Sequence, residues 1–116
     1  MPHVVRTGRA DLEAAWRALP SGPWRWGRVV ARIEGRYLAA DAVALLLQGV
    51  VVEFARPLHP VVLVTHRRDA TAVHLWPTVP VERTDAVKRL VWQVAQELTA
   101  FGAGEVSSTN LEPPPG

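Results

Sequence analysis

The segment Pro23–Arg28 has the residue types and spacing best suited to chemistry. Two tryptophans alternate with arginines in it, and Arg32 continues the Arg28 face of the predicted strand. Arginine can neutralise a phosphate, and an indole ring can stack on an unpaired base. The pattern therefore raises the hypothesis of a nucleic-acid-binding strand that uses Trp24, Arg25, Trp26, Arg28 and Arg32.

A purely structural interpretation of this segment is the alternative. Its tryptophans can be core residues at the start of a strand, and an arginine above an indole is an ordinary contact within a protein. The formal net charge is only +2, which is low for a nucleic-acid-binding protein. The first 36 residues are mildly basic and the rest are mildly acidic, which hints weakly at a basic face. We therefore hold nucleic-acid binding as an alternative function.

Histidines are the next candidates, because two of them lie on the arms of a predicted hairpin. If residues 68–69 form a two-residue turn, His66 pairs with Thr71 and Leu63 pairs with His74. The two imidazoles then point to opposite faces of the sheet, whereas a register shifted by one residue would put them on the same face. We favour ordinary strand histidines over a shared metal or acid–base role, and we predict no metal site and no cofactor.

Few other residues could support catalysis. The chain has no cysteine, which excludes a disulfide, a thiolate metal site and a cysteine nucleophile. No serine lies in a Gly-x-Ser-x-Gly turn, and no glycine-rich phosphate loop is present. Glu53 lies in an apolar strand, although simple alternation would turn it outward. An enzyme or small-molecule-binding domain using Glu53 and the histidines is a further alternative, and we predict no catalytic residue.

Surface tryptophan and valine residues suggest a contact between proteins. Trp92 lies off the centre of the apolar stripe of the last predicted helix, and Val30 lies on the mostly polar face of its strand. Exposed apolar side chains often mark a contact surface, and two-fold dimers are the commonest oligomers. Our first hypothesis is a non-enzymatic interaction domain that forms a homodimer through an apolar, Trp-bearing surface. The alternative is a monomer whose tryptophans all lie inside.

The elements that position these residues follow from apolar periodicity. Residues 40–48 are apolar nearly all round, so a short buried helix is predicted there, with a strand as the rival interpretation. The resulting fold class is α+β: a mostly antiparallel sheet of four to five strands with helices packed on one face. Helices are expected over residues 8–19, 40–48 and 84–101, and strands over 24–33, 36–39, 50–55, 61–66 and 71–76.

Length and composition predict one domain. The 116 residues are 48% apolar, which is enough for a single core. We expect an α+β domain over residues 1–101 and a Pro-rich tail over 102–116, mobile unless the domain or a partner holds it. No apolar run has signal-peptide character or approaches the ~20 residues that span a bilayer. We therefore expect a soluble cytoplasmic protein with no membrane partner.

Overall fold

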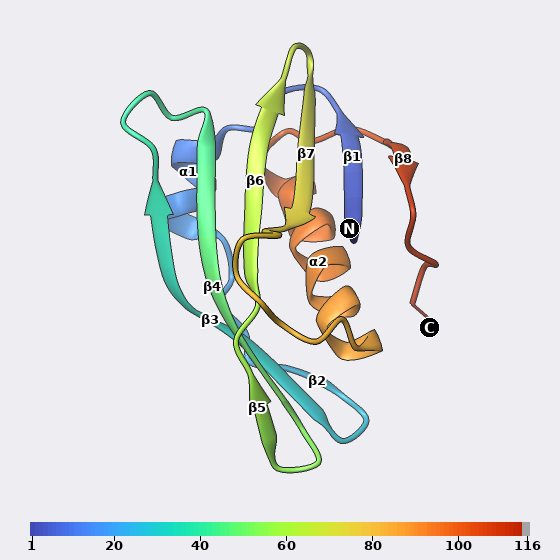
Figure 1. The fold of residues 1–116 in the computed structure, drawn as a ribbon. Helices are drawn as coiled ribbons and strands as arrows, with labels where there is room; N and C mark the ends of the chain where they lie inside the picture. The colour runs from blue at the N-terminus through green and yellow to red at the C-terminus, as the bar shows by residue number, and fades with distance from the viewer. Residues whose placement is uncertain (115–116) are drawn as a thin grey trace.

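A strongly curled antiparallel sheet dominates the computed structural model, which describes residues 1–114 (Figure 1). Residues 115–116 of the predicted tail lie outside the described part of the chain. The elements in chain order are β1 (His3–Thr7), α1 (Leu12–Ala18), β2 (Trp24–Trp26), β3 (Val29–Leu38), β4 (Ala44–Glu53), β5 (Arg56–Leu58), β6 (Val61–Arg67), β7 (Ala70–Leu75), α2 (Asp85–Glu97), the 3-10 helix η1 (Leu98–Phe101) and β8 (Val106–Thr109).

The predicted fold class is wrong, because strands outweigh helices far more than the sequence pattern indicated. The sheet runs in the order β2-β3-β4-β6-β7-β1-β8, and β5 pairs with one end of β4. The prediction had four to five strands. Within residues 1–114 only α1 and α2 are α-helices, and α1 has seven residues. The extra strands are β1 and β8 near the chain ends and the short β5, while the mistaken helix lengthens the strand predicted over residues 50–55 into β4.

The helix predicted over residues 40–48 is wrong, because β4 runs through this segment. Its backbone pairs with β3 on one side and with β6 on the other. Leu46 lies half-buried on the opposite face from three fully buried side chains: Leu45, Leu47 and Val51. A strand with apolar residues on both faces has the same all-round apolar pattern as a short buried helix, so periodicity could not separate them.

The two ends of the chain contribute strands that the sequence analysis did not assign. β1 lies between β7 and β8, with Val4 opposite Val73 on one side and Thr109 on the other. The approach to β8 is held by Thr7, whose carbonyl accepts from the amide of Gly104 at 2.7 Å. Part of the predicted tail is therefore the last strand of the sheet.

Both helices pack on the same face of the sheet, behind it in Figure 1. α2 crosses β1, β4 and β7, while α1 lies against β3 and β4. The predicted final helix is confirmed as α2 with η1, and Thr84 caps it by accepting from the amide of Val87 at 3.2 Å. α2 approaches β4 so closely at Gly49 that an added Cβ would lie 2.6 Å from Leu90.

None of the helices formed by residues 1–114 is long and apolar enough to cross a membrane. The predicted strand over residues 24–33 is divided into β2 and the start of β3 by a turn at Gly27 and Arg28. The predicted short strand over residues 36–39 continues β3 rather than standing alone. β3 is ten residues long, because one register shift next to Glu34 lets it stay paired with β4 throughout.

Candidate interaction surface

The face of the sheet opposite the helices carries one continuous row of side chains across five strands. His3 of β1 lies opposite His74 of β7, and His74 lies opposite Leu63 of β6. Leu63 in turn lies opposite Leu46 of β4, which lies opposite Tyr37 of β3. Residues that stand directly opposite each other in a ladder share a face and interact. We call His3, His74, Leu63, Leu46 and Tyr37 the central row.

The positions beside the central row on this helix-free face are also uncharged. One neighbouring row consists of Val5, Ala72, Thr65 and Ala44, and the other of Val61, Gln48 and Gly35. Within the central row, Tyr37 exposes 58% of its surface, and Leu46 and Leu63 are half-buried. This zone is uncharged, and its positions on β3, β4 and β6 are exposed or half-buried, so it has the composition of a contact surface.

His74 is the most buried member of the central row, with 9% of its surface exposed. Its Nδ1 atom is buried and has no hydrogen-bond partner among the described residues. Desolvation, reinforced by the positive charge of Arg67 and by His3, lowers the pKa of His74 below its ordinary value of 6.5. The imidazole is therefore uncharged at neutral pH, and it adds no charge to the apolar zone.

The predicted hairpin register is confirmed, and it separates the two histidines that the sequence analysis compared. His66 pairs with Thr71 and Leu63 pairs with His74 across the turn at residues 68–69. His66 points to the helix side, where its Nε2 atom lies 2.7 Å from the carbonyl oxygen of Ala10. The neighbour that the sequence analysis missed is His3, because β1 was not assigned as a strand.

The two predicted interface residues lie on different surfaces. Val30 is on the helix-free face, where it pairs with Val52 of β4 and with Arg25 of β2. Trp92 is on α2, on the other side of the sheet, and is half-buried. Its indole Nε1 atom is buried and has no hydrogen-bond partner among the described residues. The structure therefore does not bring Trp92 and Val30 together.

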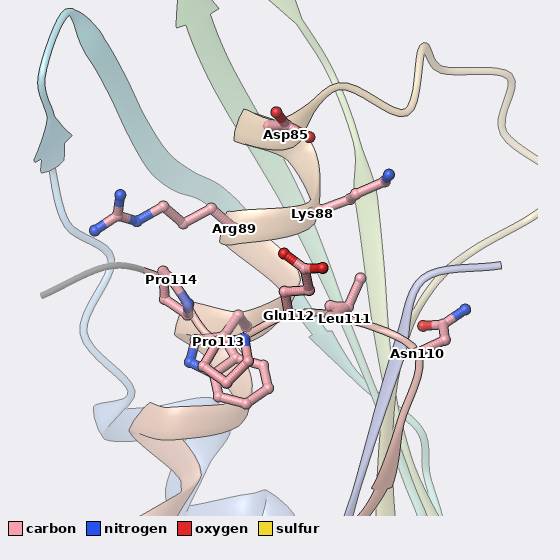
Figure 2. A pocket seen from close by; sticks show the side chains of 9 residues that line it. Asp85, Lys88, Arg89, Asn110, Leu111, Glu112, Pro113 and Pro114 are labelled. Atoms are coloured by element: carbon pink, nitrogen blue, oxygen red, sulfur yellow. The ribbon is translucent and has the colours of Figure 1, made fainter.

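A cleft of about 450 Å³ separates α2 from the C-terminal segment beside Trp92. Figure 2 shows this segment along the helix, with Glu112 between the side chains of Lys88 and Arg89. The charges that line the cleft have both signs, so it has no clear preference for an anion or a cation. Its lining consists of Asp85, Lys88, Arg89, Trp92 and residues 110–114.

The residues proposed to bind nucleic acid divide between the two faces of the sheet. Trp24 and Trp26 pair with Ala31 and Val29 and pack against the core on the helix side. Arg89 of α2 lies over the ring of Trp26, 5.0 Å from its centroid. The exposed arginines lie elsewhere. Arg25 and Arg32 are on the helix-free face, and Arg28 is in the turn. No stacking surface with interleaved arginines results.

The groups considered for a small-molecule site are also dispersed. Glu53 lines a shallow hollow of about 340 Å³ that contains no histidine. His59 is exposed, with its Nδ1 atom 3.9 Å from a carboxylate oxygen of Glu34. Within residues 1–114, no three His, Cys, Asp or Glu side chains are grouped so that they could hold a metal ion. The geometry therefore gives most support to a contact surface.

Comparisons with known proteins give no guidance on function. No protein-family model matches the chain. No curated protein and no solved structure matches it either. The helix-free face is thus interpreted from its own residues.

Proposed function

We propose that this chain is a small, non-enzymatic interaction domain that forms a homodimer by packing the helix-free faces of two sheets together. The observation that supports this most is the central row, in which Leu46 and Leu63 stand side by side without a charged neighbour in the adjacent rows. Two sheets packed face to face lie ~10 Å apart and bury such side chains between them. A cytoplasmic location remains a prediction from the sequence.

A second copy is the partner that best fits the order of the central row. A two-fold axis parallel to the strands, between Leu63 and Leu46, reverses the row, so that Leu46 of each copy meets Leu63 of the other. Tyr37 at one end then approaches His3 and His74 at the opposite end. Both ends combine a ring with a polar atom, which suits the border of an interface.

Leu63→Glu tests this dimer, because it places a charge at the centre of the proposed interface. Burying an unpaired carboxylate is costly, so we expect the dimer dissociation constant to rise at least about tenfold, which is ~1.4 kcal/mol. Sedimentation equilibrium on wild type and variant measures the constant. Phe54→Glu is the matched control, since Phe54 is 81% exposed in the turn between β4 and β5, away from the central row.

Three outcomes would contradict the proposal. The first is a wild-type chain that stays monomeric at high concentration. The second is a dimer that Trp92→Ala weakens but Leu63→Glu does not, which would place the contact on α2. The third is a monomer that co-purifies with nucleic acid at low salt and releases it at high salt. That result would favour the arginines at positions 25, 28 and 32.

A further inference from the structure

His3 and His74 stand opposite each other at the closest kind of position in an antiparallel ladder. The amide of Leu75 donates to the carbonyl of Pro2 at 3.0 Å, so these two residues form a hydrogen-bonded pair. Hydrogen-bonded and non-hydrogen-bonded pairs alternate along the ladder, so the adjacent pair, His3 and His74, is of the second kind. Such pairs have Cα atoms ~4.5 Å apart, and both imidazoles lie on the helix-free face.

The ring of His3 is held with one nitrogen free to bind. Its Nδ1 atom lies 3.0 Å from the carbonyl oxygen of Met1. A carbonyl oxygen can only accept, so Nδ1 is the protonated nitrogen and Nε2 retains its lone pair. Histidines that bind metals ordinarily donate the other ring N–H to a carbonyl or a carboxylate. The hydrogen bond from Nδ1 of His3 to the carbonyl oxygen of Met1 is of this kind.

Residues near the C-terminal end of the described chain hold His3 in place. The side-chain oxygen of Asn110 accepts from the amide of His3 at 3.0 Å, and its nitrogen donates to the carbonyl of Met1 at 2.8 Å. The hydroxyl of Thr109 donates to the carbonyl of His3 at 2.7 Å. These contacts fix the backbone on both sides of the imidazole.

His74 supplies an independent sign that a partner is missing from this position. Buried polar atoms in proteins nearly always have a hydrogen-bond partner, and exceptions often indicate a bound ion or water. Its side chain is nine-tenths buried, and the Nδ1 atom has no partner among the described residues. A bound ion would give this Nδ1 atom the partner that none of the described residues supplies.

We propose that His3 and His74 together bind one divalent transition-metal ion, with Zn²⁺ as the test ion. Imidazole nitrogen is a preferred zinc ligand at ~2.0–2.1 Å, and opposed strand side chains begin close enough for both rings to reach one ion. Two water molecules complete the usual four ligands. The site needs one copy of the chain only, so it does not depend on the proposed dimer.

Calorimetric titration of the untagged chain with ZnCl₂, in a buffer that does not bind zinc, tests the site. We expect one ion per chain, with perturbed NMR signals from the rings of His3 and His74. Removing either ligand, by His3→Ala or by His74→Phe, should weaken binding at least about tenfold. His74→Phe keeps an aromatic ring in the buried position. His59→Ala, a change at an exposed histidine, should leave the affinity within about twofold.

Each alternative result would overturn the proposal. One is a wild-type chain that binds no zinc. Another is binding that survives His74→Phe but not His3→Ala, which would assign the ion to the N-terminal segment alone. Binding unchanged by both substitutions would assign it to another site. Thermal unfolding of each variant shows whether the fold is intact. If His74→Phe fails to fold, the NMR signals of the His74 ring in the wild-type chain decide the matter, because signals unchanged by zinc would exclude His74 as a ligand.

Discussion

Arg6 is a buried arginine whose partners are carbonyl and hydroxyl oxygens. Only 8% of its surface is exposed, and this burial lowers the pKa of its guanidinium group. The group donates to the carbonyl oxygens of Gly104, Ala95 and Ala103, the last at 3.3 Å, and to the hydroxyl of Thr99 at 2.9 Å. Arg6 therefore joins β1 to the end of α2 and to η1, where free carbonyls of a helix need donors.

Replacing Arg6 by Met should destabilise the protein by about 2–4 kcal/mol, because several buried acceptors lose their donor at once. The free energy of unfolding in urea measures this loss. Arg25→Met is the matched control, since Arg25 is exposed on β2 and should change stability by less than about 0.5 kcal/mol. Equal losses from the two substitutions would contradict the anchoring role of Arg6.

The sequence indicated contacts between residues close together in the chain, but it did not indicate contacts between distant residues. The register of the β6–β7 hairpin could be predicted, because a two-residue turn fixes the pairing of both arms. The opposition of His3 and His74 could not be predicted, because more than half of the chain separates them in sequence. Trp24 and Trp26 share a face by alternation, but only the position of α2 shows that this face is the inner one.

At the scale of elements, the turn between β4 and β5 adopts an unfavourable backbone conformation. Glu53 pairs with Arg56, which leaves Phe54 and Ala55 as a two-residue turn. Their φ angles are 52° and 60°, in the left-handed region that costs energy for residues other than glycine. Asn-Gly is the sequence that such a turn prefers.

The double substitution Phe54→Asn and Ala55→Gly should therefore stabilise the protein by roughly 1–2 kcal/mol. The urea midpoint should rise while the slope of the transition stays unchanged. Gly27→Ala is a control with the opposite expected sign. Gly27 has a φ of 61°, so replacing it by alanine should destabilise the protein. A lower midpoint in the double variant would show that the Phe54 side chain makes stabilising contacts.

Apolar periodicity predicted the amphipathic helix α2 better than it predicted the buried strand β4. α2 has one apolar stripe and a clear N-cap, and its predicted extent agrees with the structure. α1 is shorter than the helix predicted over residues 8–19, because it begins after its N-cap Asp11. The failure at β4 has a different origin, because hydrogen bonds to β3 and β6 determine its conformation, and no local pattern records them.

At the scale of the whole molecule, the proposed dimer makes thermal stability depend on concentration. A hundredfold rise in protein concentration should raise Tm by roughly 5 °C, because association stabilises the folded chains by mass action. Scanning calorimetry at several concentrations measures this. Leu63→Glu should remove the dependence and Phe54→Glu should retain it. A wild-type Tm that does not change with concentration would contradict the dimer.

The overall topology depends on contacts that join the two ends of the chain, which explains why the sequence alone could not predict it. β1 and β8 are short and have little alternation of their own. Each becomes a strand because its neighbour offers free backbone groups. The residues of the helix-free face follow only from the register of all five strands that carry the central row.

The sheet ends at both edges in short strands, with three residues in β2 and four in β8. Pro23, immediately before β2, has no backbone N–H to offer an added strand. The exposed side chains of β8 include two serines. Edges of this kind are poor templates for amyloid-like stacking of further chains. β2 covers only residues 29–31 of β3, so residues 32–38 pair with β4 alone, and Arg32, Glu34 and Arg36 place charges along this open edge. Detachment of β8 would uncover a second edge, that of β1.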